Sequence, residues 1–316
     1  DLFAGAGGLS LGFMQTQKYD VKVAFENNKN MQETYRRNHP GVDVQGDVCA
    51  ADYNEIRKKY GEIDIVIGGP PCQGFSNANR QKNHAISMNN MLVKQYIRAV
   101  IELQPKAFVM ENVSMLRSEV HRFYLEKGDE ELVEKYHIPV KTTDLVLLEK
   151  KYVFDGVLDI LKDRNSITDC LWPEEHYATL NVIYKAAKNP KKMIEALNKH
   201  KAKLMKYAEE YIEIEENSFV KKQSKQAFST LKKYYEGSSE ADDILSNIET
   251  AIMIQRMVSK SKEIYDNNIV VDTYDCSGDI VAKIRSFAVY DYLKAILGAE
   301  ENGYNITSDV LCAANY

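Results

Sequence analysis

The sequence predicts an α/β protein in which a parallel, doubly wound sheet is interrupted by a long helical insertion. Short apolar runs alternate with helical patterns up to residue 116, as parallel strands with crossover helices require. A Lys- and Glu-rich stretch with apolar residues at helical spacing follows, and the alternation returns near residue 283. We therefore expect an α/β core at 1–116, a mainly helical insertion at 117–282 and a return to the core at 283–316.

The spacing of apolar residues predicts each element of the core. The run at 63–67 is apolar except for Asp64, which favours a strand buried on both faces. In order, we expect a strand at 21–25, a helix carrying Met31 and Tyr35, a helix at 53–60 ended by Gly61, the strand at 63–67, a helix beginning at Asn89 and a strand at 107–110.

The region beyond the core predicts long helices. Apolar stripes at 177–216 and 242–265 are typical of packing faces in a helical bundle, and a partner or DNA surface is the alternative. Near the end of the chain, Ser286 is expected to cap a helix that stops at Gly298. The segment 304–312 is expected to form a strand.

Composition narrows the class of protein. With 44% hydrophobic and 28% charged residues, the 316-residue chain is typical of a soluble globular protein. Its five cysteines include no C-x-x-C pair, which argues against a disulfide framework or a zinc site and suits the cytoplasm. The net charge of −5 indicates no overall basic surface. We expect a cytoplasmic monomer without a metal or a membrane segment.

Both ends of the chain favour a piece of a longer protein. Asp1 lies in what reads as the end of a strand, and Tyr316 follows an apolar run without a polar tail. We therefore expect a fragment.

A glycine-rich turn and two acids predict a nucleotide-like ligand. The turn at residues 3–8 joins a strand end to a helix start, where helix N–H groups can face a ligand. Alone, such a turn also serves NAD, FAD or packing. Glu26 stands where an acid accepts bonds from ribose hydroxyls, and Asp47 follows the next strand. Turn, acid and acid at successive strand ends indicate an adenosine-containing ligand.

The segment 68–76 presents a cysteine on a stiff loop. Cys72 follows Pro70 and Pro71 directly after the apolar run, and prolines restrict the backbone. An exposed thiol on such a loop is typical of a nucleophile, and an ordinary turn with a buried cysteine is the alternative. Glu111 ends the next strand, where ligand sites of parallel sheets gather.

Together these motifs resemble the cytosine-5 DNA methyltransferases, in that family's order and spacing. The matching residues are Phe3-Ala4-Gly5-Ala6-Gly7-Gly8, Glu26, Gly46-Asp47, Pro70-Pro71-Cys72-Gln73-Gly74-Phe75-Ser76 and Glu111-Asn112-Val113. The resemblance implies a Rossmann-like sheet, S-adenosyl-L-methionine as cofactor, and double-stranded DNA from which the target cytosine is flipped out. Asn27 departs from members that place an aromatic residue there.

The resemblance also implies roles for individual residues. Cys72 would add to carbon 6 of cytosine, and Glu111 would supply a proton or hydrogen bond at N3. Glu26 would hold the cofactor ribose, and Asp47 with Val48 the adenine. The remaining cofactor residues would be Phe3, Gly5, Gly7, Gly8, Pro70 and Leu92. Substrate or DNA contacts would come from Pro71, Gln73, Gly74, Ser76, Arg80, Asn112 and Val113, with 76–88 as a loop that closes over DNA.

The expected function is that of a DNA cytosine-5 methyltransferase from a restriction–modification system. Weak or no methyl transfer is expected from these 316 residues alone, because the family's base-positioning arginines and target-recognition region do not follow the last predicted strand. Two alternatives stay open: a tRNA cytosine-5 methyltransferase, and a non-catalytic or split-enzyme subunit that binds cofactor or DNA.

Overall fold

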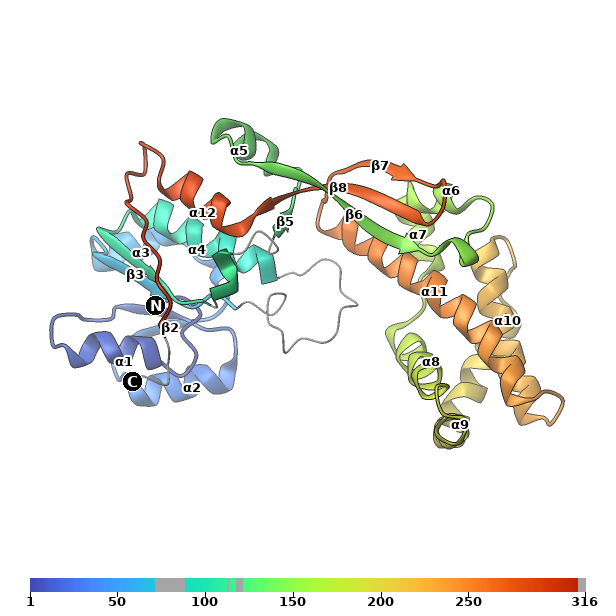
Figure 1. The fold of residues 1–316 in the computed structure, drawn as a ribbon. Helices are drawn as coiled ribbons and strands as arrows, with labels where there is room; N and C mark the ends of the chain where they lie inside the picture. The colour runs from blue at the N-terminus through green and yellow to red at the C-terminus, as the bar shows by residue number, and fades with distance from the viewer. Residues whose placement is uncertain (72–88, 113, 118–121, 312–316) are drawn as a thin grey trace. The chain divides into compact units, whose positions relative to one another are not determined.

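The computed structural model describes residues 1–71, 89–112, 114–117 and 122–311 (Figure 1). The chain forms two compact units, residues 1–141 with 286–316 and residues 142–285. It passes from one unit to the other within strands β6 (Val140–Leu148) and β8 (Ile280–Ala288). The boundaries predicted at 116/117 and 282/283 stay a proposal.

The first unit is built on parallel strands. Strand β1 (Val23–Phe25) pairs with β2 (Asp43–Gln45), and β3 (Ile65–Gly68) pairs with β4 (Ala107–Met110), all in parallel. Leu2 lies between the two pairs and forms parallel bridges to Phe25 and to Gly68. The order is therefore β2, β1, Leu2, β3, β4, and the predicted α/β class is confirmed.

Gly68 lets the backbone of Leu2 approach β3 closely. A Cβ added at Gly68 would lie 2.4 Å from the carbonyl oxygen of Leu2, which is far inside van der Waals contact. The amide of Leu2 donates to the carbonyl of Ile67 at 2.8 Å. The glycine that ends β3 is thus required by the neighbouring backbone.

Three helices of the first unit form where the sequence predicts them: one carries Met31 and Tyr35, one covers 53–60 and one begins at Asn89. The side chains of Asn28 and Asp52 accept bonds from the first amides of the second and third helices. Gly61 ends the third helix with a left-handed φ of 78°. The helices are α1 (Gly8–Gln15), α2 (Lys29–Asn38), α3 (Tyr53–Tyr60), α4 (Asn89–Leu103), α5 (Glu130–Lys135) and α12 (Val289–Leu297), with short turns η1 (Val48–Ala50) and η2 (Ser114–Arg117).

The prediction that Ser286 caps the last helix is wrong. Ser286 is buried inside β8, where it pairs with Tyr124 of strand β5 (Arg122–Tyr124). Its hydroxyl accepts a bond from Nε of Arg122 at 2.8 Å. Helix α12 begins after Ala288 instead, because pairing with a strand far away in the chain overrides the local preference of serine for a cap.

The strand predicted at 304–312 does not form in its described part, 304–311. Tyr304 anchors this segment, since its ring packs against Phe108 with centroids 5.3 Å apart and its hydroxyl donates to the carbonyl of Pro105 at 2.6 Å. Val310 and Leu311 are 52% and 76% exposed. The segment is held by side chains rather than by a strand ladder, and Cys312 lies outside the described residues.

The second unit contains the predicted helical insertion. Strand β7 (Val271–Asp275) pairs antiparallel with β8; these strands and helix α10 were not predicted. The helices are α6 (Val157–Leu161), α7 (Arg164–Cys170), α8 (Glu174–Ala186), α9 (Pro190–Ile212), α10 (Phe219–Tyr235) and α11 (Ala241–Asp266), with the turn η3 (Lys150–Tyr152) (Figure 1).

The core of the second unit surrounds Trp172. Apolar residues of α8, α9, α10 and α11 pack around it, as the apolar stripes at 177–216 and 242–265 predict for α8, α9 and α11. Its indole N–H donates to Oγ of Ser224 at 2.8 Å, and its amide donates to Oε1 of Gln255 at 2.9 Å. Both bonds are buried, so they fix the start of α8 against α10 and α11.

His176 of α8 is buried in the same core. Its ring centroid lies 3.9 Å from that of Tyr207, and Nε2 lies 3.4 Å from a carboxylate oxygen of Glu210. Burial lowers the pKa of His176, while the carboxylates of Glu210 and Glu175 act in the opposite direction. The folded unit therefore favours the neutral imidazole.

This burial predicts a loss of stability in mild acid. The buried, neutral His176 contributes fully to the free energy of unfolding above the ordinary pKa of 6.5. This contribution is lost as the pH falls from there through the lower folded-state pKa. Below about pH 6.5, the His176→Phe variant should reduce the slope of unfolding free energy against pH by up to about 1.4 kcal/mol per pH unit. Trp172, the chain's single tryptophan, reports this unfolding by fluorescence in urea. A His200→Gln control should keep the slope, and an unchanged slope in His176→Phe would contradict the assignment.

Candidate functional site

Most of the described candidate residues lie at the carboxyl ends of the parallel strands. Each strand runs in the same direction, so the residues that follow the strands lie along one edge of the sheet, where ligands bind in such folds. The glycine turn at 3–8 follows Leu2, Glu26 follows β1, Asp47 follows β2, Gly69 and Pro70 follow β3, and Glu111 follows β4.

The glycine turn has an unusual backbone. Phe3, Gly5 and Gly7 all adopt left-handed φ angles of 57°, 55° and 92°. For the non-glycine Phe3 this conformation costs about 1 kcal/mol or more, a strain that is frequent at ligand sites. Gly7 is the N-cap of α1 and provides no side-chain cap, unlike Asn28 and Asp52 on the next two helices. The first amides of α1 are therefore available to a ligand.

Glu26 joins the glycine turn to the start of α2. Its Oε2 accepts from the amide of Gly5 at 2.8 Å, and its Oε1 accepts from the amide of Asn28 at 2.7 Å. The carboxylate is half-buried. Each oxygen keeps a further lone pair, so ribose hydroxyls can bind without breaking these bonds.

Asp47 and Val48 lie in a loop that α4 holds in place. The exposed Asp47 accepts from the amide of Cys49 at 2.9 Å, and Val48 is buried. Nη2 of Arg98, on α4, donates to the carbonyls of Val48 at 3.0 Å and Ala51 at 3.4 Å. This loop is thus positioned by a cation that lies 50 residues away from Val48.

The ends of β3 and β4 are joined at Pro70. Nδ2 of Asn112 donates to the carbonyl of Pro70 at 3.1 Å. A Cβ added at Gly69 would lie 3.0 Å from Oε2 of Glu111, so that carboxyl lies beside the loop. Glu111 is exposed, whereas Pro71 and Leu92 are half-buried.

Several candidate residues lie outside the described residues. They are Cys72, Gln73, Gly74, Ser76, Arg80 and Val113, together with the rest of the predicted loop 76–88. Pro70, two residues before Cys72, is nevertheless bonded to the neighbour of Glu111. The placement of the Cys72 thiol opposite the Glu111 carboxyl stays a prediction.

Three supports of the glycine turn were missed by the sequence interpretation. Asn38 donates to the carbonyl of Ala6 at 3.0 Å, and Nε2 of His39 lies 3.0 Å from the carbonyl oxygen of Gly7. The hydroxyls of Ser10 and Tyr35 are 2.7 Å apart. The only sequence signal was the spacing of Tyr35 and His39 on one helix face, which predicts burial but no polar contact.

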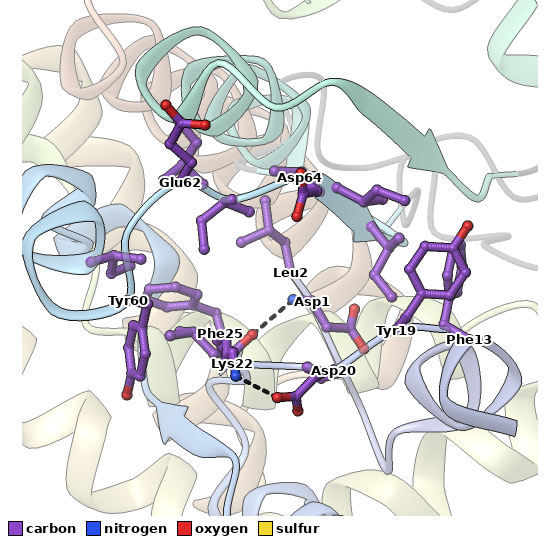
Figure 2. A pocket seen from close by; sticks show the side chains of 18 of the residues that line it. Asp1, Leu2, Phe13, Tyr19, Asp20, Lys22, Phe25, Tyr60, Glu62 and Asp64 are labelled. Atoms are coloured by element: carbon purple, nitrogen blue, oxygen red, sulfur yellow. Dashed lines mark hydrogen bonds and ion pairs between the residues drawn. The ribbon is translucent and has the colours of Figure 1, made fainter. Parts of the chain in front are cut away.

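A pocket of about 330 Å³ lies at the opposite edge of the sheet (Figure 2). Figure 2 shows Lys22 and Asp20, which precede β1, and Glu62 and Asp64, which precede β3, around it. Its lining includes none of the predicted site residues. Because it lies at the amino ends of the strands, we do not assign the cofactor to it.

Two negative findings apply to the described ranges. Within 1–71, 89–112, 114–117 and 122–311, no group of three or more His, Cys, Asp or Glu side chains is arranged to hold a metal ion. Over the same residues, every helix is too short or too polar to cross a membrane.

Comparison with known proteins finds relatives of the N-terminal part of the chain. Residues 1–144 match the family model of C-5 cytosine-specific DNA methylases. The type II methyltransferase M.XorII of Xanthomonas oryzae is 42% identical over 139 residues, which cover 40% of this chain and 30% of that protein. M1.HphI of Haemophilus parahaemolyticus is 43% identical over 120 residues, covering 37% and 32%. Residues 1–144 are thus similar in sequence to the C-5 cytosine-specific DNA methylases.

The extent of these similarities is limited. The chain spans about a third of the length of these two relatives, and the family match ends at residue 144, so nearly all of the second unit lies outside it. A solved Escherichia coli structure, described as a prophage-encoded DNA modification methyltransferase, is 30% identical over 48% of this chain and 41% of that chain. Its TM-score is 0.33, too low to support an argument about the fold.

Proposed function

We propose that the chain carries the cofactor-binding and catalytic core of a DNA cytosine-5 methyltransferase, the modification enzyme of a restriction–modification system. One observation carries the proposal. In the part of the chain that the family model matches, the glycine turn, Glu26, Asp47 and Glu111 follow neighbouring parallel strands at one sheet edge. That edge is where the family chemistry requires cofactor and base to meet.

The described residues fit S-adenosyl-L-methionine as cofactor. The left-handed turn at 3–7 brings backbone close to a ligand, and the uncapped start of α1 offers N–H donors. Glu26 keeps lone pairs for ribose hydroxyls, and the exposed Asp47 keeps a second carboxylate oxygen for the adenine amino group. Val48, Pro70 and Leu92 would supply the apolar walls. When bound, this cofactor supplies an electrophilic methyl group.

The chain's own residues would make carbon 5 of cytosine reactive. The Cys72 thiolate adds to carbon 6, and the electron pair of the 5,6 double bond moves so that carbon 5 becomes nucleophilic. Glu111 would supply a proton or hydrogen bond at N3, where negative charge would otherwise build up. After carbon 5 has gained the methyl group it loses its proton to a base, and the sulfur–carbon bond breaks to return the thiolate. The base must first leave the duplex.

Arg98 is expected to support cofactor binding through the loop that contains Asp47 and Val48. An Arg98→Met variant leaves the carbonyl of Val48 without this donor, and a bond to a charged donor is worth about 1.5–3 kcal/mol. Affinity for S-adenosyl-L-methionine should fall by about tenfold or more in calorimetric titration. The matched control is Arg57→Met, because exposed Arg57 donates to a carbonyl of α4 outside the loop. Equal affinity in both variants would contradict this role.

The proposed function is tested by the product formed. The protein, expressed from its complete reading frame, is incubated with methyl-labelled cofactor and either plasmid DNA or tRNA, and the nucleosides are separated by mass spectrometry. We expect the label in 5-methyldeoxycytidine. Label in tRNA would favour the tRNA enzyme, and label on the N4 amino group of cytosine or on adenine would contradict the proposal. Cofactor binding without transfer to either substrate would favour a non-catalytic or split-enzyme subunit.

A further inference from the structure

A strongly basic stretch belongs to the second unit, whereas the residues assigned to catalysis belong to the first. Between residues 185 and 206 the sequence has eight lysines and a single acidic residue, Glu195. All eight lysines are exposed, in the end of α8, the connection and the first five turns of α9. The lysines of this basic stretch are Lys185, Lys188, Lys191, Lys192, Lys199, Lys201, Lys203 and Lys206.

Most of these charges are not neutralised by the protein itself. Lys203 pairs with Glu175 at 2.6 Å, and Lys206 lies 3.9 Å from Glu210. Lys201 lies over the ring of Tyr235. In the part of the chain that the structure describes, the other five lysines form no side-chain hydrogen bond or ion pair: Lys185, Lys188, Lys191, Lys192 and Lys199.

Helix stability does not explain where the lysines stand. Lys191 and Lys192 occupy the first turn of α9, which contains no acid, although the positive end of the helix dipole disfavours cations there. Lys199 and Lys203 are like charges four residues apart, which is also unfavourable. The arrangement weakens the helix slightly, which points to an anionic partner rather than to folding.

We propose that this basic stretch binds the phosphate backbone of duplex DNA without reading its sequence. The inference rests on the proposed function, because it takes DNA as the substrate. From Lys192 to Lys206, α9 rises about 21 Å, a length that spans about six phosphates on one DNA strand. Lys192, Lys199, Lys203 and Lys206 recur at helical spacing on one side of α9.

A protein partner fits this surface less well. Protein interfaces are depleted in lysine and depend on buried aromatic or apolar anchors. Within residues 185–206, all of which the structure describes, the only large apolar side chain that is exposed is Ile194, at 43%. Flexible ammonium groups around so little apolar surface suit phosphates.

The test compares two fourfold variants with the unaltered protein, all expressed from the complete reading frame. The first replaces Lys188, Lys191, Lys192 and Lys199 with alanine. The control replaces Lys127, Lys150, Lys162 and Lys222, which are also exposed but lie outside the basic stretch. Binding to a labelled 30-base-pair A·T duplex without cytosine is measured by anisotropy at several salt concentrations. Alanine favours helix, so α9 should persist, and circular dichroism checks this.

We expect the first variant to bind the duplex about tenfold or more weakly near 0.1 M salt, with the slope of log affinity against log salt smaller by about 2 to 4. The control variant should keep most of the duplex affinity and most of the salt slope. Equal losses in the two variants, or duplex binding too weak to measure in the unaltered protein, would overturn the proposal. Preference for single-stranded RNA of equal length would also overturn it. Since the duplex has no cytosine, these outcomes are separate from failure of methyl transfer.

Discussion

Cys72→Ser is expected to reduce methyl transfer to DNA by about a thousandfold or more, with little change in cofactor affinity. A serine hydroxyl is almost never ionised near neutral pH, whereas a thiolate is a strong nucleophile towards carbon 6. Turnover is measured by label transfer to plasmid DNA, and affinity by calorimetric titration. The loss should therefore fall on the chemical step alone.

Cys49→Ser is the matched control. Cys49 is exposed at its surface and follows Val48 in the loop proposed to hold adenine, but partial desolvation and then the nearby Asp47 carboxylate raise the pKa of its thiol. It is thus poorly suited to act as a nucleophile, and its replacement should leave turnover near the original value. Retained turnover in Cys72→Ser, or a comparable loss in Cys49→Ser, would contradict the assignment of the nucleophile.

Gly7→Ala is expected to destabilise the first unit by about 3 kcal/mol and to abolish measurable cofactor binding. The added Cβ would lie 2.2 Å from Nε2 of His39 and 3.0 Å from the ring of Tyr35. Those two rings are buried and packed together, with centroids 4.5 Å apart, so neither can move away easily. The φ of 92° is unfavourable for alanine as well. Calorimetric unfolding and cofactor titration measure the two effects.

Gly12→Ala separates this clash from the mere addition of a methyl group. Gly12 lies in the same helix, and a Cβ there meets no atom within 4 Å. Alanine at that exposed position should stabilise α1 by about 0.5–1 kcal/mol and leave cofactor binding intact. If both alanine variants unfold at the temperature of the original protein, the close packing of His39 against Gly7 is not required.

The sequence predicted those elements whose signal is local. The apolar run before Gly68 and the four apolar residues of β4 read as strands, because strands of a parallel sheet seldom alternate with polar residues. Ser286 was assigned wrongly because its partner, Arg122, lies 164 residues away in the chain. Nothing in the local pattern distinguishes a serine that caps a helix from one that lies in a strand.

The candidate site also contains residues that the sequence could predict and residues that it could not. Glu26 and Asp47 could be proposed from position, since acids after successive strands share one edge of a parallel sheet. The side chains that hold the glycine turn and the Asp47 loop could not be predicted from the sequence. Asn38, His39 and Arg98 contact backbone carbonyls far away in sequence. Helical periodicity indicates which face is buried, but it does not indicate which carbonyl a buried polar group will meet.

The central claim is that Cys72 becomes covalently bound to cytosine, and one measurement tests it most directly. Plasmid DNA made with 5-fluorodeoxycytidine is incubated with the protein and S-adenosyl-L-methionine, because fluorine at carbon 5 cannot leave as a proton does and the adduct persists. After digestion with trypsin and nuclease, mass spectrometry should find the fluorinated nucleotide on the peptide 60–80, whose only cysteine is Cys72. An adduct on any other peptide, or the absence of an adduct from protein that forms 5-methylcytosine in ordinary DNA, would contradict the account.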